Sequence, residues 1–403
     1  DDGTAKIWDA VSGALLIDIK GHSGYVTSAQ FNPAGDKIVT SSFDSTAKIW
    51  DVATGKLLLQ FKGHEDAIIR VVFSPVSADD PSGGSKILTA SIDKTAAIWD
   101  AENGKLLVEL KGHNDIIWDA HFSSDGKKVL TASFDKTAKI WDAINGKLLF
   151  TLKGHTEAIN RAEFNYDGQK IVTASADRTA KIWDATTGKL LFDLAGNLDA
   201  LKRAHFSFDG KYVVTAADDG NARIWDANTG EMIKSLEAHF DYVNDAQFSP
   251  DGKKIATASS DKSVIIWETA TGKILTDMLG HSAYVKSAVF SPDGKNILTA
   301  NYDLTFKKWD ASNGDLVGYW DSHDVIFSAE YSPFNKRDSV AGKRIVTSSA
   351  DSTASIWDNN SGDLLVTLKG HRNWVVDAQF SPDAAKVVTA SWDKTVKVWD
   401  AGS

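Results

Sequence analysis

Cysteine is absent from this chain of 403 residues, and several other features are missing with it. Without thiols there is no disulfide framework and no zinc site built on thiolates, which suits a cytoplasmic protein. No apolar stretch approaches the roughly 20 residues that a membrane-spanning helix needs. No window repeats its apolar residues with the period of a long amphipathic helix. We therefore expect a cytoplasmic protein built from strands, with no membrane association.

Positive charge and proline are also scarce. Lys and Arg number 44 against 54 Asp and Glu, so the formal net charge is −10. Non-specific nucleic-acid binding depends on phosphate neutralisation by basic residues, and no basic stripe is visible, so we expect no nucleic-acid partner. Six of the seven prolines follow an expected first strand, where a missing N–H does no harm: Pro33, Pro75, Pro250, Pro292, Pro333 and Pro382.

Tryptophan, by contrast, recurs at a fixed interval. Seven of the nine steps in the series are 42 residues long, and the other two are 49 and 48. A period of about 20–50 residues indicates a solenoid, propeller or array, whose repeats must stack because none can bury its apolar face alone. The series is Trp8, Trp50, Trp99, Trp141, Trp183, Trp225, Trp267, Trp309, Trp357 and Trp399.

Each repeat has the pattern of four short strands. In the repeat that starts at Gly154, residues 158–164 alternate apolar and polar, and residues 170–174 are rich in β-branched side chains. Asp167-Gly168 between them is typical of a tight hairpin turn. Residues 180–183 and 190–194 supply a third and a fourth strand. The chain is therefore expected to be all-β.

Four strands per repeat, with Gly-His at the start and Trp-Asp after the third strand, resemble the WD40 family over the whole chain, residues 1–403. The resemblance implies a single β-propeller domain in which each repeat forms a four-stranded antiparallel blade. It also implies a hydrogen-bonded tetrad in each blade, placed here on His155, Thr173, Asp177 and Trp183 in blade 4. In blade 5, Asn197 replaces the histidine, and we expect that blade to be less rigid.

The number of blades depends on how the chain ends meet. The chain begins with two strands, Ala5 to Trp8 and Leu15 to Ile19, and ends with the first three strands of a repeat. If Leu15 to Ile19 pairs with those three, the ring closes with nine blades. Eight blades with a loose terminal unit, or an open or swapped assembly, are the alternatives. The strand Ala5 to Trp8 is surplus, so it must fray, displace its copy or mark a cut from a longer chain.

A His, a Thr and an Asp in each repeat look like a nucleophile triad. A catalytic site occurs once, however, whereas this set recurs in eight repeats, which favours a structural role. His121 and His205 share one offset in the first strand and could face a central channel, or could be ordinary polar lining. Metal-ligand spacing, a phosphate loop and a nucleophile elbow are absent from the sequence. We expect no enzyme, no metal and no cofactor.

The resemblance implies that partners dock on the top face, through three positions per blade: third and fifth after the histidine, and the residue before the tetrad Asp. Blades 4 to 6 are polar there, and the offsets place Ile326, Ser328 and Ala350 in blade 8. Blades 7-8-9-1-2-3 would form an apolar arc that binds a protein or peptide, although its rings could instead pack on neighbouring blades. The candidate binding residues are Tyr25, Phe43, Ile69, Ile92, Ile116, Trp118, Phe134, Tyr284, Tyr302, Trp374 and Trp392.

An arginine cluster for phosphate would need basic residues at these three positions, where only Lys202 and Lys286 are basic. Arg70, Arg161 and Arg203 lie one residue further along the strand, and since Asp119, Asp245 and Asp377 share that offset, we expect intramolecular pairing.

The two long intervals in the tryptophan series come from insertions at residues 75–86 and 333–343. Both belong on the bottom face, as contacts to another domain or as tolerated loops.

The sequence therefore predicts a non-catalytic scaffold or sensor that binds a protein or peptide. Close similarity among repeats resembles bacterial WD40 arrays that form the C-terminal half of larger signalling or defence proteins. The start within a repeat, without Met, agrees with an upstream effector domain, and agrees equally with excision of the repeats for expression. A self-assembling structural module and an enzyme with a site in the channel are the alternatives.

Overall fold

The computed structural model describes residues 4–8, 15–303, 305–321, 324–333, 343–359, 361, 363–393 and 395–401. Within these ranges the chain forms 37 strands and no helix, and the strands make nine separate sheets. The expected all-β fold with nine blades is confirmed. The blades fall into two compact units, Asp1–Gly112 with Trp320–Ser403, and His113–Tyr319. That residues 1–403 form one domain stays a prediction.

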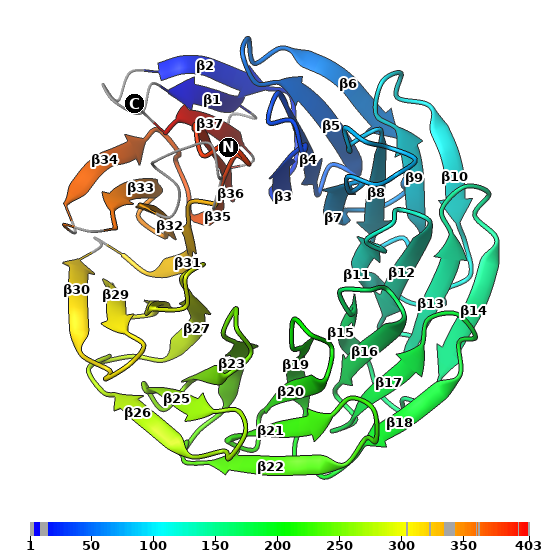
Figure 1. Cartoon of the computed structure of the whole chain (residues 1–403). Helices are drawn as coiled ribbons and strands as arrows, with labels where there is room; N and C mark the ends of the chain where they lie inside the picture. The colour runs from blue at the N-terminus through cyan, green and yellow to red at the C-terminus, as the bar shows by residue number, and fades with distance from the viewer. Residues whose placement is uncertain are drawn as a thin grey trace. The chain divides into compact units, whose positions relative to one another are not determined.

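The second compact unit, His113–Tyr319, holds blades 3 to 7, each a sheet whose four strands follow chain order. Blade 3 is β11 (Ile117–Phe122), β12 (Lys128–Ser133), β13 (Thr137–Asp142) and β14 (Leu148–Lys153). Blade 4 is β15 (Ile159–Phe164), β16 (Lys170–Ser175), β17 (Ala180–Asp184) and β18 (Leu190–Leu194). Blade 5 is β19 (Leu201–Phe206), β20 (Tyr212–Ala217), β21 (Asn221–Asp226) and β22 (Met232–Glu237). Blade 6 is β23 (Val243–Phe248), β24 (Lys254–Ser259), β25 (Val264–Glu268) and β26 (Ile274–Met278). Blade 7 is β27 (Val285–Phe290), β28 (Asn296–Asn301), β29 (Thr305–Asp310) and β30 (Leu316–Asp321). The first strands of these five blades lie next to one another in chain order (Figure 1).

The first compact unit holds the other four blades. Blade 1 is β3 (Val26–Phe31), β4 (Lys37–Ser42), β5 (Thr46–Asp51) and β6 (Leu57–Lys62). Blade 2 is β7 (Ile68–Phe73), β8 (Lys86–Ser91), β9 (Ala96–Asp100) and β10 (Leu106–Leu110). Blade 8 is β31 (Ile326–Tyr331), β32 (Arg344–Ser349), β33 (Thr353–Asp358) and β34 (Leu364–Lys369). Blade 9 is β35 (Val375–Phe380), β36 (Lys386–Ser391) and β37 (Val396–Asp400), joined by β1 (Thr4–Trp8) and β2 (Leu15–Lys20).

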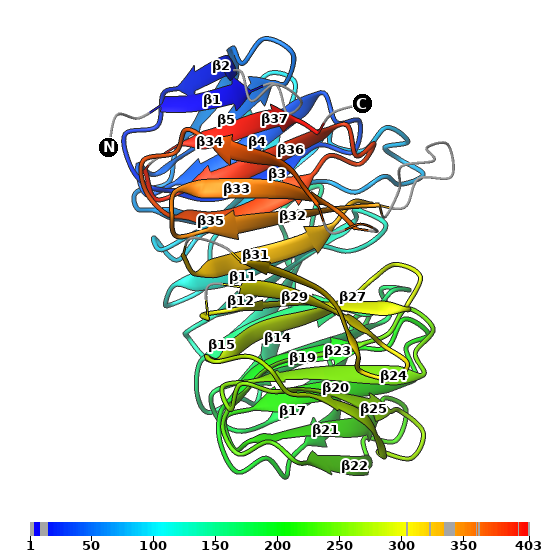
Figure 2. The ribbon, with the colours of Figure 1, turned by 90° about the vertical axis from the view of Figure 1, so that its left-hand side faces the viewer.

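Blade 9 brings the two ends of the chain together, with a difference from the expected pairing. The strand order is β2-β1-β37-β36-β35, so the N-terminal strands do complete the C-terminal sheet (Figure 2). The surplus strand β1 does not fray or displace its copy. It lies parallel to β37 and antiparallel to β2, and therefore stands between the two strands that were expected to pair directly. Because β1 finds both neighbours within the chain, its pairing gives no support to a self-assembling module.

The two insertions occupy the expected hairpins. The first joins β7 to β8, where the Asp80 carboxylate accepts hydrogen bonds from the Ser74 hydroxyl and the Ser85 N–H. Gly83 in this loop lies so close to Pro33 of blade 1 that a Cβ would come within 2.7 Å of the ring. Most of the second insertion, residues 334–342, lies outside the described residues.

The tetrad of each blade is a chain of hydrogen bonds. In blade 4, the Trp183 indole N–H donates to the Thr173 hydroxyl at 3.0 Å, and that hydroxyl lies 2.7 Å from His155 Nε2. His155 Nδ1 lies 2.8 Å from the Asp177 carboxylate. The sequence pattern missed a fifth member, Thr179, whose N–H and hydroxyl both donate to Asp177. A neutral imidazole with its proton on Nδ1 satisfies every link.

The same bonds recur along the chain. The Trp-to-Thr bond occurs in all nine blades. The His-to-Asp bond occurs in seven, at His22, His64, His113, His155, His239, His281 and His371. His323 of blade 8 lies outside the described residues.

Blade 5 replaces the histidine with a different polar network. The Arg223 guanidinium donates to the Asn197 amide oxygen at 2.9 Å and pairs with the Asp219 carboxylate at 2.9 Å. All three side chains are almost fully buried, and Arg223 lies on strand β21 where blade 4 has Lys181. The histidine is thus replaced by a compensated ion pair and not by an unfilled gap, so the substitution alone does not predict a looser blade.

Within each compact unit, apolar contacts join neighbouring blades. The Trp183 ring, 2% exposed, packs with Ala185 and Ile171 of its own blade and with Leu130 and Ile140 of blade 3. Equivalent clusters join neighbouring blades within each compact unit. Hydrogen bonds between neighbouring blades add to these contacts. Lys128 Nζ donates to the Ala185 carbonyl at 2.7 Å, and Lys170, 42 residues further on, donates in the same way to the Ala227 carbonyl. The core therefore lies between blades.

Truncation of the tetrad tryptophan tests this account. Trp183→Ala removes a buried ring and leaves the Thr173 hydroxyl without its donor, so it should lower the free energy of unfolding by about 3–5 kcal/mol. Urea denaturation followed by circular dichroism measures the change. Trp392→Ala, which removes a ring that is 45% exposed, is the matched control and should change it little. Equal losses from the two variants would show that the tetrad ring carries no special packing.

Arg223 offers a second test, because its charge is buried with a single carboxylate. Arg223→Leu leaves Asp219 ionised in the interior, so it should destabilise the protein by about 3 kcal/mol or more. Arg223→Lys keeps the charge but not the two-pronged geometry, and should cost less. Thermal melts at neutral pH compare the two, and an unchanged melting temperature for Arg223→Leu would contradict the compensation described for blade 5.

The tetrads also predict a pH dependence. Burial lowers the pKa of His22, His113, His155 and His281 below the ordinary 6.5. Burial opposes ionisation of the tetrad aspartates, yet hydrogen bonds from His, Thr and backbone N–H hold the pKa of Asp44, Asp135 and Asp303 far below 3.8. In both cases the unfolded chain binds more protons than the folded one in acid.

The free energy of unfolding should therefore fall as the pH drops below about 6.5, and fall further below about 4. Denaturant titrations from pH 8 to pH 3.5 would show both stages. The variant His155→Asn with Lys181→Arg copies the blade 5 network into blade 4 and removes one buried imidazole, so its slope between pH 6.5 and 5 should be shallower. A slope identical to that of the original chain would contradict the role of His155.

Candidate protein-interaction site

We call the four strands of a blade a, b, c and d in chain order. The top end of each blade, where strand a begins and strand b ends, has the same backbone hydrogen bond in all nine repeats. The N–H of the residue before the tetrad Asp donates to the carbonyl of the residue just before strand a, as from Phe43 to Tyr25 at 2.8 Å and from Trp392 to Trp374 at 2.9 Å. This bond sets two of the three variable side chains next to each other. Their identities, and not the backbone, therefore distinguish one blade from another.

The third variable position lies at a β-bulge. In every blade the register between strands a and b shifts between the first and third residues of strand a, as between Ile159 and Arg161. A bulge disturbs the regular alternation of side chains and re-aims them. Consecutive residues such as Asn160 and Arg161 consequently both line the same pocket.

In the first compact unit the top ends carry exposed aromatic pairs. Trp374 and Trp392 of blade 9 stack with ring centroids 4.7 Å apart and remain 41% and 45% exposed. Tyr25 and Phe43 of blade 1 meet edge to face at 5.9 Å, and both are exposed. Phe327 of blade 8 packs on Trp374 at 5.5 Å. The rings thus contact one another and still present a large apolar surface to solvent.

In blade 8 the structure corrects the variable positions that we predicted by counting from the histidine. Its Ala350 N–H donates to the Val325 carbonyl, so Val325 and Phe327 hold the variable positions, and Ile326 and Ser328 do not. Ile326 is buried and Ser328 hydrogen-bonds to Ser348. The offset was wrong because this repeat has one residue fewer between its histidine and strand a. Aligning the strands instead of counting from the histidine would have found Phe327.

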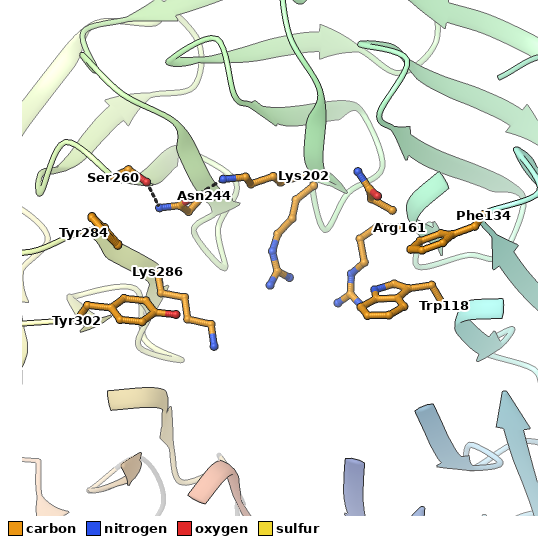
Figure 3. Close-up of a pocket in the computed structure, with 11 residues that line it drawn as sticks. Trp118, Phe134, Arg161, Lys202, Asn244, Ser260, Tyr284, Lys286 and Tyr302 are labelled. Atoms are coloured by element: carbon orange, nitrogen blue, oxygen red, sulfur yellow. Dashed lines mark hydrogen bonds between the residues drawn. The ribbon is translucent and has the colours of Figure 1, made fainter. Parts of the chain in front are cut away.

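In the second compact unit the top ends of blades 3 to 7 line one pocket of about 650 Å³. Trp118 stacks on Phe134 at 5.5 Å at one side, and Tyr284 meets Tyr302 at 5.5 Å at the other (Figure 3). Between these pairs lie the basic and amide side chains of blades 4 to 6 and Lys286. The lining is Trp118, Phe134, Asn160, Arg161, Lys202, Arg203, Asn244, Ser260, Tyr284, Lys286 and Tyr302.

Several polar groups of this pocket are held by neighbouring blades. Lys202 Nζ lies 2.9 Å from the Asp218 carboxylate and donates to the Asn244 amide oxygen at 2.8 Å. The Asn244 amide in turn donates to the Ser260 hydroxyl and to the Val285 carbonyl. Asn160 makes the equivalent bond to the Leu201 carbonyl. The pocket wall is therefore braced across the blades.

The two arginines have looser partners. Arg161 Nη1 lies 3.5 Å from Asp119 of blade 3, and Arg203 Nε lies 3.5 Å from Asp245 of blade 6. The expected pairing between neighbouring repeats is present at both. The carboxylates are buried, whereas the arginine side chains are about one-third exposed. The ion pairs thus anchor the arginines from behind while their guanidinium groups line the pocket.

The remaining predicted binding residues are less accessible. Ile69 and Ile92 of blade 2, and Ile116 and Phe134 of blade 3, are half-buried. Ala67, which shares the blade 2 top end, is buried. These side chains present less apolar surface to solvent than the exposed rings do. That the aromatic residues bind a partner stays a prediction.

His121 and His205, the two histidines outside the tetrads, each contact a carboxylate. His121 Nε2 lies 2.9 Å from Asp119 of its own blade, and His205 Nδ1 lies 3.0 Å from Glu163 of blade 4, the preceding blade. Burial disfavours the charged imidazole of His205, but the Glu163 carboxylate outweighs it and raises the pKa of His205 above 6.5. Among the described residues no group of three or more acidic or histidine side chains could hold a metal ion. Nor do those residues include a helix that could cross a membrane.

Comparison with known sequences identifies the repeats. The WD40 family, described as WD domain, G-beta repeat, matches residues 13–51, 55–100, 104–142, 146–184, 188–226, 230–268, 272–310, 314–358 and 362–400. The chain belongs to the WD40 family. Its nine blades are those of a WD40 β-propeller, and the family is typically a protein-interaction scaffold without catalytic activity. A search of curated proteins finds no match to this sequence.

Among solved structures, the chain is similar to the crystal structure of the computationally designed Ika8 protein. The sequence identity is 29% and the TM-score 0.67, over 85% of this chain and 99% of that one. The likeness agrees with the WD40 fold.

Proposed function

We propose that this WD40 protein is a non-catalytic scaffold or sensor that binds a protein or peptide through the aromatic top ends of its blades. The observation that supports this best is the stacked pair Trp374 and Trp392, whose rings are 41% and 45% exposed and outside the tetrad. Exposed tryptophan and tyrosine are the residues that most often dominate binding energy at interfaces. These rings stand at blade ends whose backbone bond is the same in every blade, which gives such a surface a rigid support.

We also propose that the chain acts as the sensing part of a larger signalling or defence protein in the cytoplasm, and that residues 1–403 work as one domain. The support is the close similarity of its repeats, which resembles that of bacterial WD40 arrays. Neither nucleic acid nor membrane is the expected partner, given a net charge of −10 and the aromatic character of the blade ends.

Peptide selection tests the binding function. Purified protein would be panned against a phage library of random peptides, and enriched peptides measured by calorimetry. The triple variant Trp118→Ala, Trp374→Ala, Trp392→Ala should bind them at least about tenfold more weakly, because truncated hot-spot rings cost roughly 2 kcal/mol or more. Its melting temperature should stay near that of the original chain, since all three rings are exposed.

A second aromatic pair supplies the control. Tyr166 and Phe208 lie in the a–b turns at the opposite end of blades 4 and 5, 4.6 Å apart and 70% and 64% exposed. Tyr166→Ala with Phe208→Ala should leave peptide affinity unchanged. Enrichment of no peptide, or a loss of affinity in this control alone, would contradict a top-end binding surface.

A further inference from the structure

The pocket of blades 3 to 7 is lined by basic and no acidic residues in a protein that is acidic as a whole, although three of the four basic residues pair with carboxylates just outside the lining. Arg161, Lys202, Arg203 and Lys286 are four of its eleven lining residues, and none of the eleven is acidic. The chain carries ten more acidic than basic residues. A local excess of cations on such a background is a specific feature of this pocket and not a reflection of overall composition.

The chemistry of the two arginines points to an anionic group. Each guanidinium has five N–H donors in a planar fork that matches a carboxylate or a phosphate. The ion pairs to Asp119 and Asp245 each use a single nitrogen at 3.5 Å, which is longer than a strong charge-assisted hydrogen bond. The buried carboxylates therefore orient the arginines and leave most of their donors directed at the pocket.

The bulge explains why both arginines reach the same space. Arg161 and Arg203 occupy the third position of strand a in neighbouring blades, directly after the register shift. Asn160 and Lys202, one residue earlier, line the same pocket. Two adjacent blades thus each contribute a pair of consecutive polar residues to one wall.

Aromatic pairs flank the cations. Trp118 and Arg161 line the same pocket as Lys286 and Tyr302, which Figure 3 shows at its other side. A ligand that fits must carry negative charge between apolar or aromatic groups, within a space of about 650 Å³. A few residues of a peptide chain meet this description.

We propose that this pocket recognises a peptide segment with an anionic side chain, a phosphorylated residue or a run of Asp or Glu, through Arg161 and Arg203, with apolar flanking residues against Trp118 and Tyr302. The proposal rests on the peptide-binding function above and specifies its ligand. A single-stranded nucleic acid could also offer anions and rings, but the net charge of −10 opposes the approach of a polyanion.

Three oriented peptide libraries test the ligand class. Each has degenerate flanking positions and one fixed central residue: serine, glutamate or phosphoserine. Bead capture of the purified full chain should be at least about tenfold greater for one or both anionic libraries than for serine, and should weaken with added salt. Preference for the phosphoserine library over the glutamate library identifies phosphate as the source of the charge. Equal capture of these two libraries, both above serine, identifies a carboxylate as sufficient.

The matched variants locate the site. Arg161→Gln with Arg203→Gln should abolish the preference for the anionic libraries, whereas Arg178→Gln, at an exposed arginine of the blade 4 b–c turn that does not line the pocket, should retain it. Arg161→Lys with Arg203→Lys keeps both positive charges and their buried carboxylate partners, but removes the planar guanidinium groups. This variant therefore separates loss of the guanidinium geometry from loss of folding. Melting temperatures of all variants accompany the binding data.

Other outcomes would overturn the proposal in distinguishable ways. Equal capture by all three libraries, lost on Trp118→Ala, would refute anion recognition and leave peptide binding standing. Capture by none of the libraries would count against both. Tighter binding of a labelled single-stranded oligothymidine than of any anionic peptide, sensitive to the arginine variants, would replace the peptide with a nucleic acid.

Discussion

The structure depends on one repeated interaction, the chain of hydrogen bonds that runs from a tryptophan through a threonine and a histidine to an aspartate. Each link uses a polar group that burial would otherwise penalise, and together they join strands a, b and c of a blade. The same tryptophan ring packs against the preceding blade, so one side chain serves both the internal order of a blade and its contact with the next. Blade 5 shows which part is essential: the histidine can be replaced, provided that the buried carboxylate keeps a side-chain hydrogen-bond donor.

A scaffold held in this way leaves the blade ends free to vary. The tetrad and the backbone bond between strands a and b fix where the variable side chains stand, but no tetrad bond uses those side chains. The bulge in strand a then exposes two consecutive residues instead of one. Aromatic pairs in the first compact unit, and a cationic pocket bordered by aromatic pairs in the second, are therefore built on identical supports.

The electrostatics of the pocket follow from the same geometry. Asp119 and Asp245 are buried at the offset that blades 4 and 5 fill with arginine. Pairing a carboxylate of one blade with a guanidinium of a neighbouring blade compensates the buried charge. It also holds the arginine side chain at the edge of the pocket. Each acidic neighbour compensates part of the charge of its arginine, while the guanidinium group still lines the pocket.

Most of the fold was determined by the sequence itself. The 42-residue interval, the Gly-His and Trp-Asp signals and the alternating strands predicted nine four-stranded blades, and in blade 4 the predicted strand ends differ from the observed ones by one residue at most. Such features are local: a period, a turn residue or a β-branched run acts within one repeat, and repetition averages out single errors.

Only the tertiary structure decided what depends on register and on contacts between repeats. Counting from the histidine misplaced Ile326 and Ser328, because a one-residue deletion is invisible without the strand pairing. The three positions implied by the family resemblance left Arg161 and Arg203 one step outside the predicted binding positions, and the bulge that brings both arginines into the pocket cannot be read from the sequence pattern. The surplus strand β1 entered blade 9 between β2 and β37, and Arg223 replaced a histidine, since both depend on which groups meet in space.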